Sequence, residues 1–346
     1  MVTLPYTTPT LQHCVTDGYL LGILESYPST EDWIMNNFTN IMINSETFFE
    51  DFYRISMCFD TPFLSQSQLQ YSFIPKMRYS FSDFLKLCLN NHYYIWLECN
   101  RKYISNYLDT KDKRHTMLIY GCDSNGFIYS DFYAKNSKGY PFVKKLQMTD
   151  EELNLSLENL GLYTPYNSGE TDFIRLLRFD HSYKYHFSVK ALITQIKNFI
   201  NGINLYSYVG NEINMNYKII KEQEIEITLF GVNCLNCIAQ GVVNPNFYSI
   251  RPVSLVYYFT ILWKKRIVFL CERKYLDSFE FNNLSSKIDL LERKISGIRL
   301  FYFKNLIADK LTDEKRYRIS EDLKTFNEEM IAFLCHVLNT LQYEDL

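Results

Sequence analysis

The sequence predicts an α+β protein, with a mixed helix-and-strand domain over residues 1–150 and a mostly helical domain over residues 151–346. Two patterns predict this division. The first part carries short runs of aromatic and β-branched residues between turn-forming residues, and the second carries apolar residues three and four positions apart. With 47% hydrophobic residues and only 12 Gly and 9 Pro in 346 residues, the chain has enough apolar material for two packed cores.

The first domain is predicted to open with a helix and to continue into a buried strand. The helix runs from Asp17 to Ser26, has clustered apolar residues, and stops before Pro28. Ser82 is the predicted N-cap of a second helix. Residues 93–97 follow as an aromatic and β-branched run, which indicates a strand buried on both faces.

A β-hairpin is the element that the sequence predicts most directly. Residues 116–120 and 127–130 are strand-forming runs, and residues 121–126 between them are turn formers. His115 precedes the first strand and Asp131 ends the second. With a five-residue loop these two residues lie directly opposite each other, whereas with a three-residue loop they share a face but are offset by about two positions. The register therefore decides whether the hairpin brings the imidazole and the carboxylate together.

Helix signals dominate the second domain. Thr149 is the predicted cap of a helix that begins at Asp150, and the Tyr-rich polar residues 163–172 are the candidate connection between the domains. Four longer segments beyond this connection have helical spacing, and a helical bundle is the economical interpretation. These segments are residues 188–203, 252–276, 285–309 and 320–341.

Charge and composition exclude several classes of protein. A formal charge of -3 argues against nucleic acid as a partner, because neutralising phosphates needs an excess of Lys and Arg. The 9 Cys are irregularly spaced and the first residues lack a signal peptide, so a reducing cytoplasm is expected. The apolar residues 253–270 are interrupted by Lys264, Lys265 and Arg266, so we expect no membrane span.

Cys14 stands where the first predicted helix begins. Unpaired backbone N–H groups and the positive end of the helix dipole favour an anion there, which lowers the pKa of a thiol from ~8.5. A nucleophilic Cys14, a base at His115 and an orienting carboxylate at Asp131 are the set that thiol-based acyl transfer requires. Each residue also has a structural interpretation, as a core thiol, a surface histidine and a turn aspartate. Asp123, in the predicted turn, competes with Asp131 for the third role.

Other candidates for chemistry are weaker. Cys234 and Cys237 form a lone Cys-x-x-Cys with no second pair at zinc spacing, so two helix-buried thiols are favoured over a metal site. His181 and His186 are five residues apart, which is a poor spacing for one helix face, and they are interpreted as structural or substrate-contacting residues. We therefore expect no bound metal and no bound cofactor.

The order of these motifs resembles the papain-like cysteine peptidase superfamily. The resemblance rests on Cys14 before a helix, a buried strand, residues 115–123, and Ser130-Asp131 after the turn. Within the superfamily the chain is similar to the peptidases that cut double-glycine leaders. It more closely resembles the butirosin biosynthesis protein H type, which are papain-fold acyltransferases of natural-product pathways. Three further segments carry this closer likeness, at residues 98–103, 230–234 and 249–252.

The resemblance implies a papain-like fold for residues 1–150, followed by a helical domain that shapes the acceptor pocket or the carrier-protein dock. It makes Cys14 the nucleophile, His115 the general base and acid, and Asp131 the group that orients the imidazole. Two departures bear on the activity. Thr8 stands where such enzymes usually have an oxyanion-hole Gln, which leaves Gln12 as the nearby candidate, and Val15 replaces the Gly that the peptidases tend to have. Both favour acyl transfer over proteolysis.

The reaction that the resemblance implies moves an acyl group from a phosphopantetheine thioester on an acyl or peptidyl carrier protein to Cys14, and then to an amine. The product is an amide, as in the similar enzymes of closthioamide-type pathways. A leader-processing peptidase and an inactive papain-like scaffold remain the alternatives. A basic group ahead of the hairpin is a candidate contact for an acidic carrier helix, with a solvated loop as the equal alternative. Its members are Arg101, Lys102, Lys111, Lys113 and Arg114.

Overall fold

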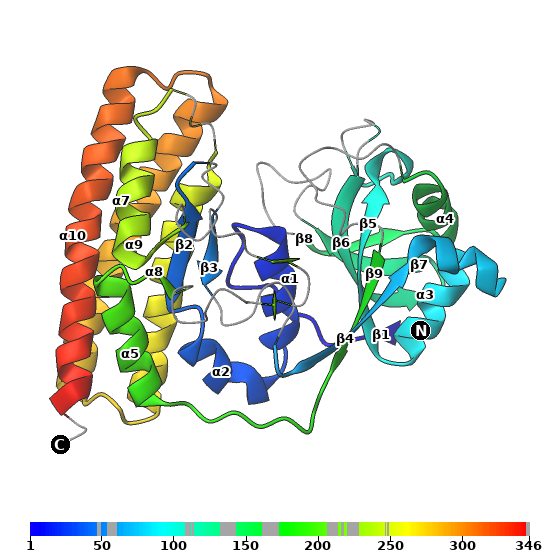
Figure 1. The fold of residues 1–346 in the computed structure, drawn as a ribbon, viewed down its shortest axis with the longest axis horizontal. Helices are drawn as coiled ribbons and strands as arrows, with labels where there is room; N and C mark the ends of the chain where they lie inside the picture. The colour runs from blue at the N-terminus through cyan, green and yellow to red at the C-terminus, as the bar shows by residue number, and fades with distance from the viewer. Residues whose placement is uncertain are drawn as a thin grey trace. The chain divides into compact units, whose positions relative to one another are not determined.

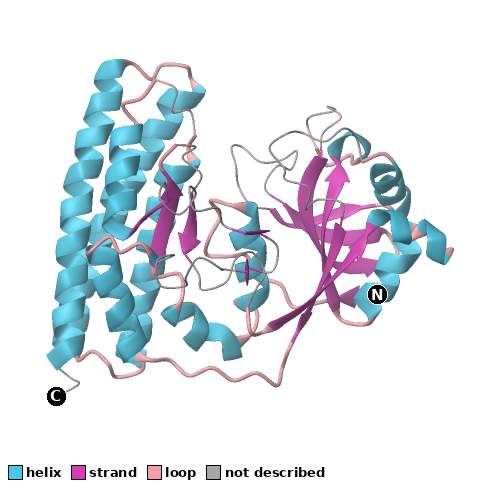
Figure 2. Cartoon of the chain, viewed as in Figure 1, coloured by secondary structure: helices cyan, strands magenta, loops and turns pink. Residues whose placement is uncertain are grey.

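The computed structural model describes most of the chain and divides it into two compact units. The first unit holds residues 1–31 and 56–184, and the second holds residues 32–55 and 185–346. The fold is α+β, with a large antiparallel sheet in the first unit and a mostly helical second unit (Figures 1 and 2). The described residues are 1–46, 50–53, 61–107, 112, 114–131, 143–160, 173–205, 214–215, 218–219, 228–245, 247 and 249–343.

A seven-stranded antiparallel sheet forms the frame of the first unit. Its strand order is β4-β9-β5-β6-β7-β8, and β1 pairs with β6. Helices α3 and α4 contact each other and β5, while α1 contacts β6. The strands are β1 (Val2–Thr3), β4 (Leu64–Gln70), β5 (Tyr93–Asn100), β6 (Arg114–Asp123), β7 (Gly126–Asp131), β8 (Val143–Met148) and β9 (Phe173–Phe179). The helices are α1 (Val15–Leu24), α3 (Phe81–Asn90) and α4 (Asp150–Glu158), with short 3-10 turns η1 (Pro28–Thr30), η2 (Tyr71–Phe73), η3 (Pro75–Met77) and η4 (Arg101–Tyr103).

The predicted first helix is confirmed as α1, which begins and ends two residues earlier than expected. From Asp17 onwards every residue of α1 is buried. Gly22 permits this burial, because a Cβ at that position would lie 2.4 Å from the ring of Tyr6. The segment before the helix can therefore cross α1 closely, and it leads the chain directly to Cys14.

The predicted boundary near residue 150 does not coincide with the observed units. Residues 173–179, where the sequence indicated the beginning of a helical domain, form β9, and this strand lies between β4 and β5 in the sheet. Arg175 is buried on this strand, with its guanidinium 4.8 Å from the ring centre of Trp96. The first unit therefore continues to Lys184. The predicted connection at residues 163–172 lies outside the described residues.

Two predicted helix caps have different outcomes. Thr149 caps α4 as predicted, because its side chain accepts from the backbone N–H of Glu152 and the Glu152 side chain accepts from the Thr149 backbone. The prediction for Ser82 is wrong. Ser80 caps α3 by accepting from the backbone N–H of Asp83, whereas the Ser82 N–H donates to the Asn154 side chain at 2.9 Å.

The second unit contains long helices and a small three-stranded sheet. All four predicted helical segments are confirmed, and the last two begin earlier than predicted. The sheet has the order β12-β2-β3, and β10 and β11 form a separate pair. The helices are α2 (Glu31–Asn36), α5 (Val189–Ile200), α7 (Gly231–Gly241), α8 (Arg251–Glu272), α9 (Ser278–Ile307) and α10 (Asp313–Tyr343). The strands are β2 (Asn40–Asn44), β3 (Glu50–Tyr53), β10 (Asn214–Met215), β11 (Lys218–Ile219) and β12 (Thr228–Phe230).

Within the second unit, Arg266 of α8 holds the end of α2. It is completely buried, and its Nε and Nη2 donate to the backbone carbonyls of Met35 and Asn37 at 2.8 and 3.0 Å. Its guanidinium also lies 4.5 Å from the ring centre of Trp263. Arg266, one of the three charged residues that interrupt the apolar stretch of α8, thus donates to the carbonyls at the end of α2. Across the helices that the structure describes, none has the length and apolar character needed to cross a membrane.

Candidate active site

His115 and Asp131 meet in the first unit, as the sequence predicted. The Nε2 atom of His115 lies 2.7 Å from Oδ1 and 2.8 Å from Oδ2 of Asp131. The Asp131 side chain is completely buried, and the His115 side chain is 11% exposed. A buried carboxylate therefore fixes the orientation of an imidazole that is still accessible from one side.

The hairpin that carries this pair is confirmed, but its turn is tighter than either predicted loop. Asp123 pairs with Gly126 across a two-residue turn, and Gly126 has a φ of +121°, which an L side chain rarely adopts. If this register continued unbroken, Asp131 would pair with Leu118. Because Leu118 is three positions from His115, and strand side chains alternate between faces, the carboxylate and the imidazole would then lie on opposite faces of the sheet.

A β-bulge in β6 shifts this register by one residue. The pairing shifts between residues 119 and 121, so Tyr120 is an extra residue in β6, and Leu118 pairs with Ser130. One step further along, Asp131 is two positions from His115 and on the same face. The predicted offset of two positions is therefore confirmed, while its cause, a bulge and not a loop length, was not predicted.

Tyr107 is a third member of the site that the sequence analysis missed. Its hydroxyl donates to Oδ2 of Asp131, and its ring packs edge-on against the His115 ring with centroids 5.5 Å apart. Burial, followed by the nearby charge of Asp131, raises the pKa of Tyr107 well above its usual value. The phenol therefore keeps its proton and acts as a donor. It holds the carboxylate in place while the carboxylate holds the imidazole.

This arrangement predicts the effect of Tyr107→Phe. Removing the hydroxyl leaves the buried carboxylate with one charge-assisted hydrogen bond fewer, and the loss of such a bond amounts to about 1.5–3 kcal/mol. If the site performs the acyl transfer expected from the sequence, kcat should fall by about 10-fold to 100-fold with little change in KM. Steady-state kinetics with an acyl thioester and an amine measures both parameters. Tyr103→Phe, on η4, is the matched control and should leave kcat within twofold of the wild-type value.

Cys14 occupies the N-cap position of α1, as its predicted place before a helix required. Its backbone is extended (φ -134°, ψ 141°), its thiol is not in a disulfide, and the residue is partly exposed. Its carbonyl accepts from the N–H of Gly18 at 3.0 Å, which closes the first turn of the helix. The thiol thus stands at the positive end of the helix dipole, where a thiolate is favoured.

Tyr19 ties α1 to the strand of the histidine. Its hydroxyl donates to the backbone carbonyl of Thr116 at 3.0 Å, and Thr116 is the residue after His115. Burial and then the charge of Asp131 raise the pKa of Tyr19, so this donor is also retained. Since Asp131 holds Nε2 of His115, Nδ1 is the ring nitrogen through which the imidazole would exchange a proton with a thiol. Cys14, His115 and Asp131 all belong to the first unit.

Two other predicted residues have local hydrogen bonds. The side-chain amide of Gln12 donates to the carbonyl of Pro9 at 3.1 Å, and its oxyanion role stays a prediction. Asp123, the competitor of Asp131, accepts from the Asn125 N–H and from the Gln147 side chain, each at 2.8 Å. Asp123 is eight positions from His115 along β6, or about 26 Å at ~3.3 Å per residue. Within the described strands it is thus Asp131 that orients the histidine.

The two thiols of the Cys-x-x-Cys and the basic group are further candidates for chemistry. Cys234 is buried on α7 and Cys237, on the same helix, is partly exposed. In the part of the chain that the structure describes, no cluster of three or more His, Cys, Asp or Glu could hold a metal ion. Of the basic group, Lys111 and Lys113 lie outside the described residues. The guanidinium of Arg101 lies 6.0 Å from the ring centre of Tyr107, so it brings positive charge next to the tyrosine that contacts Asp131.

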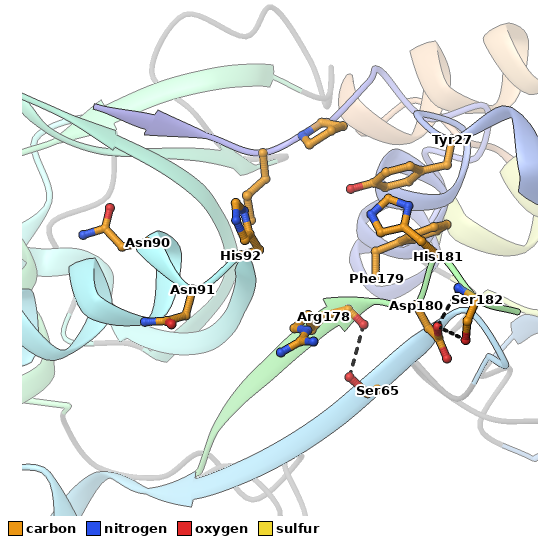
Figure 3. Close-up of a pocket in the computed structure, with 12 residues that line it drawn as sticks. Tyr27, Ser65, Asn90, Asn91, His92, Arg178, Phe179, Asp180, His181 and Ser182 are labelled. Carbon is orange, nitrogen blue, oxygen red and sulfur yellow. Dashed lines mark hydrogen bonds between the residues drawn. The ribbon is translucent and has the colours of Figure 1, made fainter.

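A pocket of about 860 Å³ opens elsewhere in the first unit. Figure 3 shows Tyr27, Phe179 and His181 on one side of it and His92 on the other. Tyr27 stacks on Phe179 with ring centroids 3.6 Å apart. The pocket and the pair formed by His115 and Asp131 lie at opposite ends of β5. At one end Tyr93 pairs with the lining residue Arg178, and at the other end Cys99 pairs with His115. Cys14, His115 and Asp131 do not line it.

A scan against protein-family models gives no match for this chain, and a comparison with curated proteins gives none either. The case for a function rests on the side chains described above.

Proposed function

We propose that this protein is a thioester-dependent N-acyltransferase, built on a papain-like fold, that forms an amide bond in specialised metabolism. Cys14 is the nucleophile, His115 the general base and acid, and Asp131 the residue that orients His115. The observation that supports the proposal most strongly is the contact of both Asp131 oxygens with Nε2 of His115, at 2.7 and 2.8 Å. With Nε2 held in this way, Nδ1 is the ring nitrogen left to exchange a proton with Cys14 at the start of α1, and such a pairing is what an activated cysteine needs.

The reaction proceeds in two half-reactions. The Cys14 thiolate attacks the thioester carbonyl of an acyl group carried on phosphopantetheine, and the pantetheine thiolate leaves with the proton of the His115 imidazolium. The acyl group is then bonded to the sulfur of Cys14. An amine attacks this acyl-enzyme, His115 accepts the amine proton, and the Cys14 thiolate is released with the amide. Asp131 stabilises the imidazolium at each stage without taking its proton.

The surroundings of the site favour acyl transfer over proteolysis and favour a carrier-bound donor. Val15 follows Cys14 where the peptidases tend to have Gly, and Gln12 uses its amide on its own loop. Arg101 brings positive charge next to Tyr107. A guanidinium is suited to the phosphate of phosphopantetheine and to the acidic surface of an acyl or peptidyl carrier protein. The acceptor is an amine-bearing small molecule.

Intact-protein mass spectrometry with an acyl-pantetheine thioester tests this function. We expect the wild-type protein to gain one acyl group, which an added amine then removes as the amide. Cys14→Ala should gain none, whereas Cys237→Ala, which removes another partly exposed thiol, should behave like the wild type. A wild-type protein without an adduct, or an adduct that persists in Cys14→Ala, would contradict the proposal.

A leader-processing cysteine peptidase is the second candidate, because the same three side chains could cleave a peptide bond. The two activities differ in what they need. A peptidase hydrolyses a peptide with no amine acceptor present, whereas the proposed enzyme forms no product from a peptide alone. Incubation with a double-glycine leader peptide, followed by mass spectrometry of the peptide, distinguishes them.

A further inference from the structure

A buried histidine and a buried carboxylate lie on either side of the candidate nucleophile in the sequence. The Nε2 atom of His13 lies 3.5 Å from Oδ2 of Asp17, and both side chains have no exposed surface. The two residues are four positions apart, on either side of Cys14. At 3.5 Å the contact is within ion-pair range but longer than an ordinary hydrogen bond, so the attraction between opposite charges matters more here than a directed bond.

Fold stability alone gives little reason for charged groups at this place. Removing a carboxylate and an imidazolium from water carries a desolvation penalty that can exceed their mutual attraction, and an apolar pair of similar volume is often as stable. Asp17 also occupies the third position of α1, from which a side chain reaches back towards the N-cap residue. Residues at this spacing have Cβ atoms about 5–6 Å apart. At this spacing we expect the carboxylate of Asp17 to lie close to the thiol of Cys14.

A lone carboxylate at this position would oppose ionisation of the thiol, because like charges repel strongly where water is excluded. We infer that His13, as an imidazolium, neutralises Asp17 and so permits Cys14 to exist as a thiolate. His13 and Asp17 are positioning residues, because they act through Cys14 and require no contact with substrate. This inference rests on the proposed role of Cys14 as the nucleophile and adds a second ionisable pair that controls it.

Four other ionisable groups or pairs among the described residues near this end of α1 are paired or neutral. Helix α1 packs against β6, whose charged groups near Thr116 form pairs with β5 and β7. The neighbouring tyrosines keep their protons, because burial raises the pKa of each. These groups are Arg114 with Glu98 at 3.9 Å, His115 with Asp131, and the tyrosines Tyr6 and Tyr19. The imidazole of His13, 3.5 Å from Asp17, is placed to compensate the carboxylate when the ring is protonated.

The pH dependence of Cys14 alkylation by iodoacetamide tests the inference. Mass spectrometry of the Cys14 peptide follows the rate in the wild type, His13→Gln and the double variant His13→Gln/Asp17→Asn. We expect His13→Gln to raise the alkylation pKa of Cys14 by about one to two units, because the carboxylate loses its compensating charge. The double variant removes both charges and should return the pKa to within about half a unit of the wild-type value.

Recovery in the double variant separates charge compensation from a packing role, since a packing defect would persist or worsen. His186→Gln is the matched control, because His186 is exposed and belongs to the second unit. An unchanged pKa in His13→Gln, or a double variant that stays shifted, would overturn the inference. If His13→Gln does not fold, NMR of the His13 ring decides: we expect a cation at pH 7 in the wild type and a neutral ring in Asp17→Asn. A neutral wild-type ring would equally overturn it.

These measurements use the free protein and no acyl donor, so their outcome is independent of the acylation test. If the alkylation pKa of Cys14 depends on His13 and Asp17 but no acyl adduct forms, this inference holds and the acyltransferase proposal fails. If an acyl adduct forms but the alkylation pKa is the same with and without His13, the acyltransferase proposal holds and this inference fails.

Discussion

Asp131→Asn should lower kcat/KM for amide formation by roughly 10³-fold to 10⁴-fold, which is the loss seen when a triad carboxylate becomes an amide. The substitution preserves shape but removes the charge that stabilises the His115 imidazolium. It also replaces one acceptor oxygen by a donor, so His115 Nε2 can no longer be held by two equivalent oxygens. The protein should still fold, because Tyr107 can donate to the remaining carbonyl oxygen of the amide.

The matched control is Asp123→Asn, in the turn of the same hairpin. Its carboxylate accepts from Asn125 and Gln147 and lies far along β6 from His115. We expect its kcat/KM to stay within about twofold of the wild-type value, since surface substitutions of this kind change little. Comparable losses in both variants would mean that the hairpin, and not the carboxylate that orients His115, is what the activity depends on.

Arg266→Ala should destabilise the second unit by about 3–5 kcal/mol, although Arg266 is remote in sequence from every candidate site residue. The substitution leaves the carbonyls of Met35 and Asn37 buried without their donors and opens a cavity beside Trp263. Both effects are large because the guanidinium has no exposed surface. Arg266→Lys should fall between Ala and the wild type, since an ammonium group cannot reproduce the planar fork.

Chemical unfolding followed by tryptophan fluorescence measures this effect, with Trp33 and Trp263 as reporters in the second unit. Arg318→Ala on α10 is the control, because that side chain is 73% exposed and its ion pair with Asp322 spans 4.0 Å. We expect the control to lose less than about 0.5 kcal/mol. Equal unfolding midpoints for the Arg266 and Arg318 variants would show that the hydrogen bonds of Arg266 to the end of α2 do not stabilise the second unit.

The hairpin shows what sequence patterns can and cannot predict. Strand-forming runs and turn formers located both strands, because these signals depend on neighbouring residues alone. The bulge at Tyr120 was not predictable in the same way. It arises where β6 pairs with β7 on one side and, at Gly121 and Cys122, with β1 as well. Yet this bulge decides whether His115 and Asp131 share a face.

Elements that depend on distant contacts were missed for the same reason. Strand β9 has two charged residues in its interior, Arg175 and Arg178, which weaken its strand pattern, and it is stabilised by β4 and β5 on either side. Tyr107 has no local signal either, because its partner Asp131 comes from another strand. The His13–Asp17 pair is different. Its four-residue spacing was visible in the sequence and could have been found by looking for opposite charges one helical turn apart.

The alkylation rate of Cys14 in His115→Gln tests most directly whether Cys14 and His115 act as one unit. If the imidazole takes the thiol proton, the variant should react with iodoacetamide at least about 10-fold more slowly than the wild type at pH 7. Its alkylation pKa should rise towards that of an ordinary thiol. A rate and pKa equal to those of the wild type would contradict the account, because Cys14 would then ionise without His115.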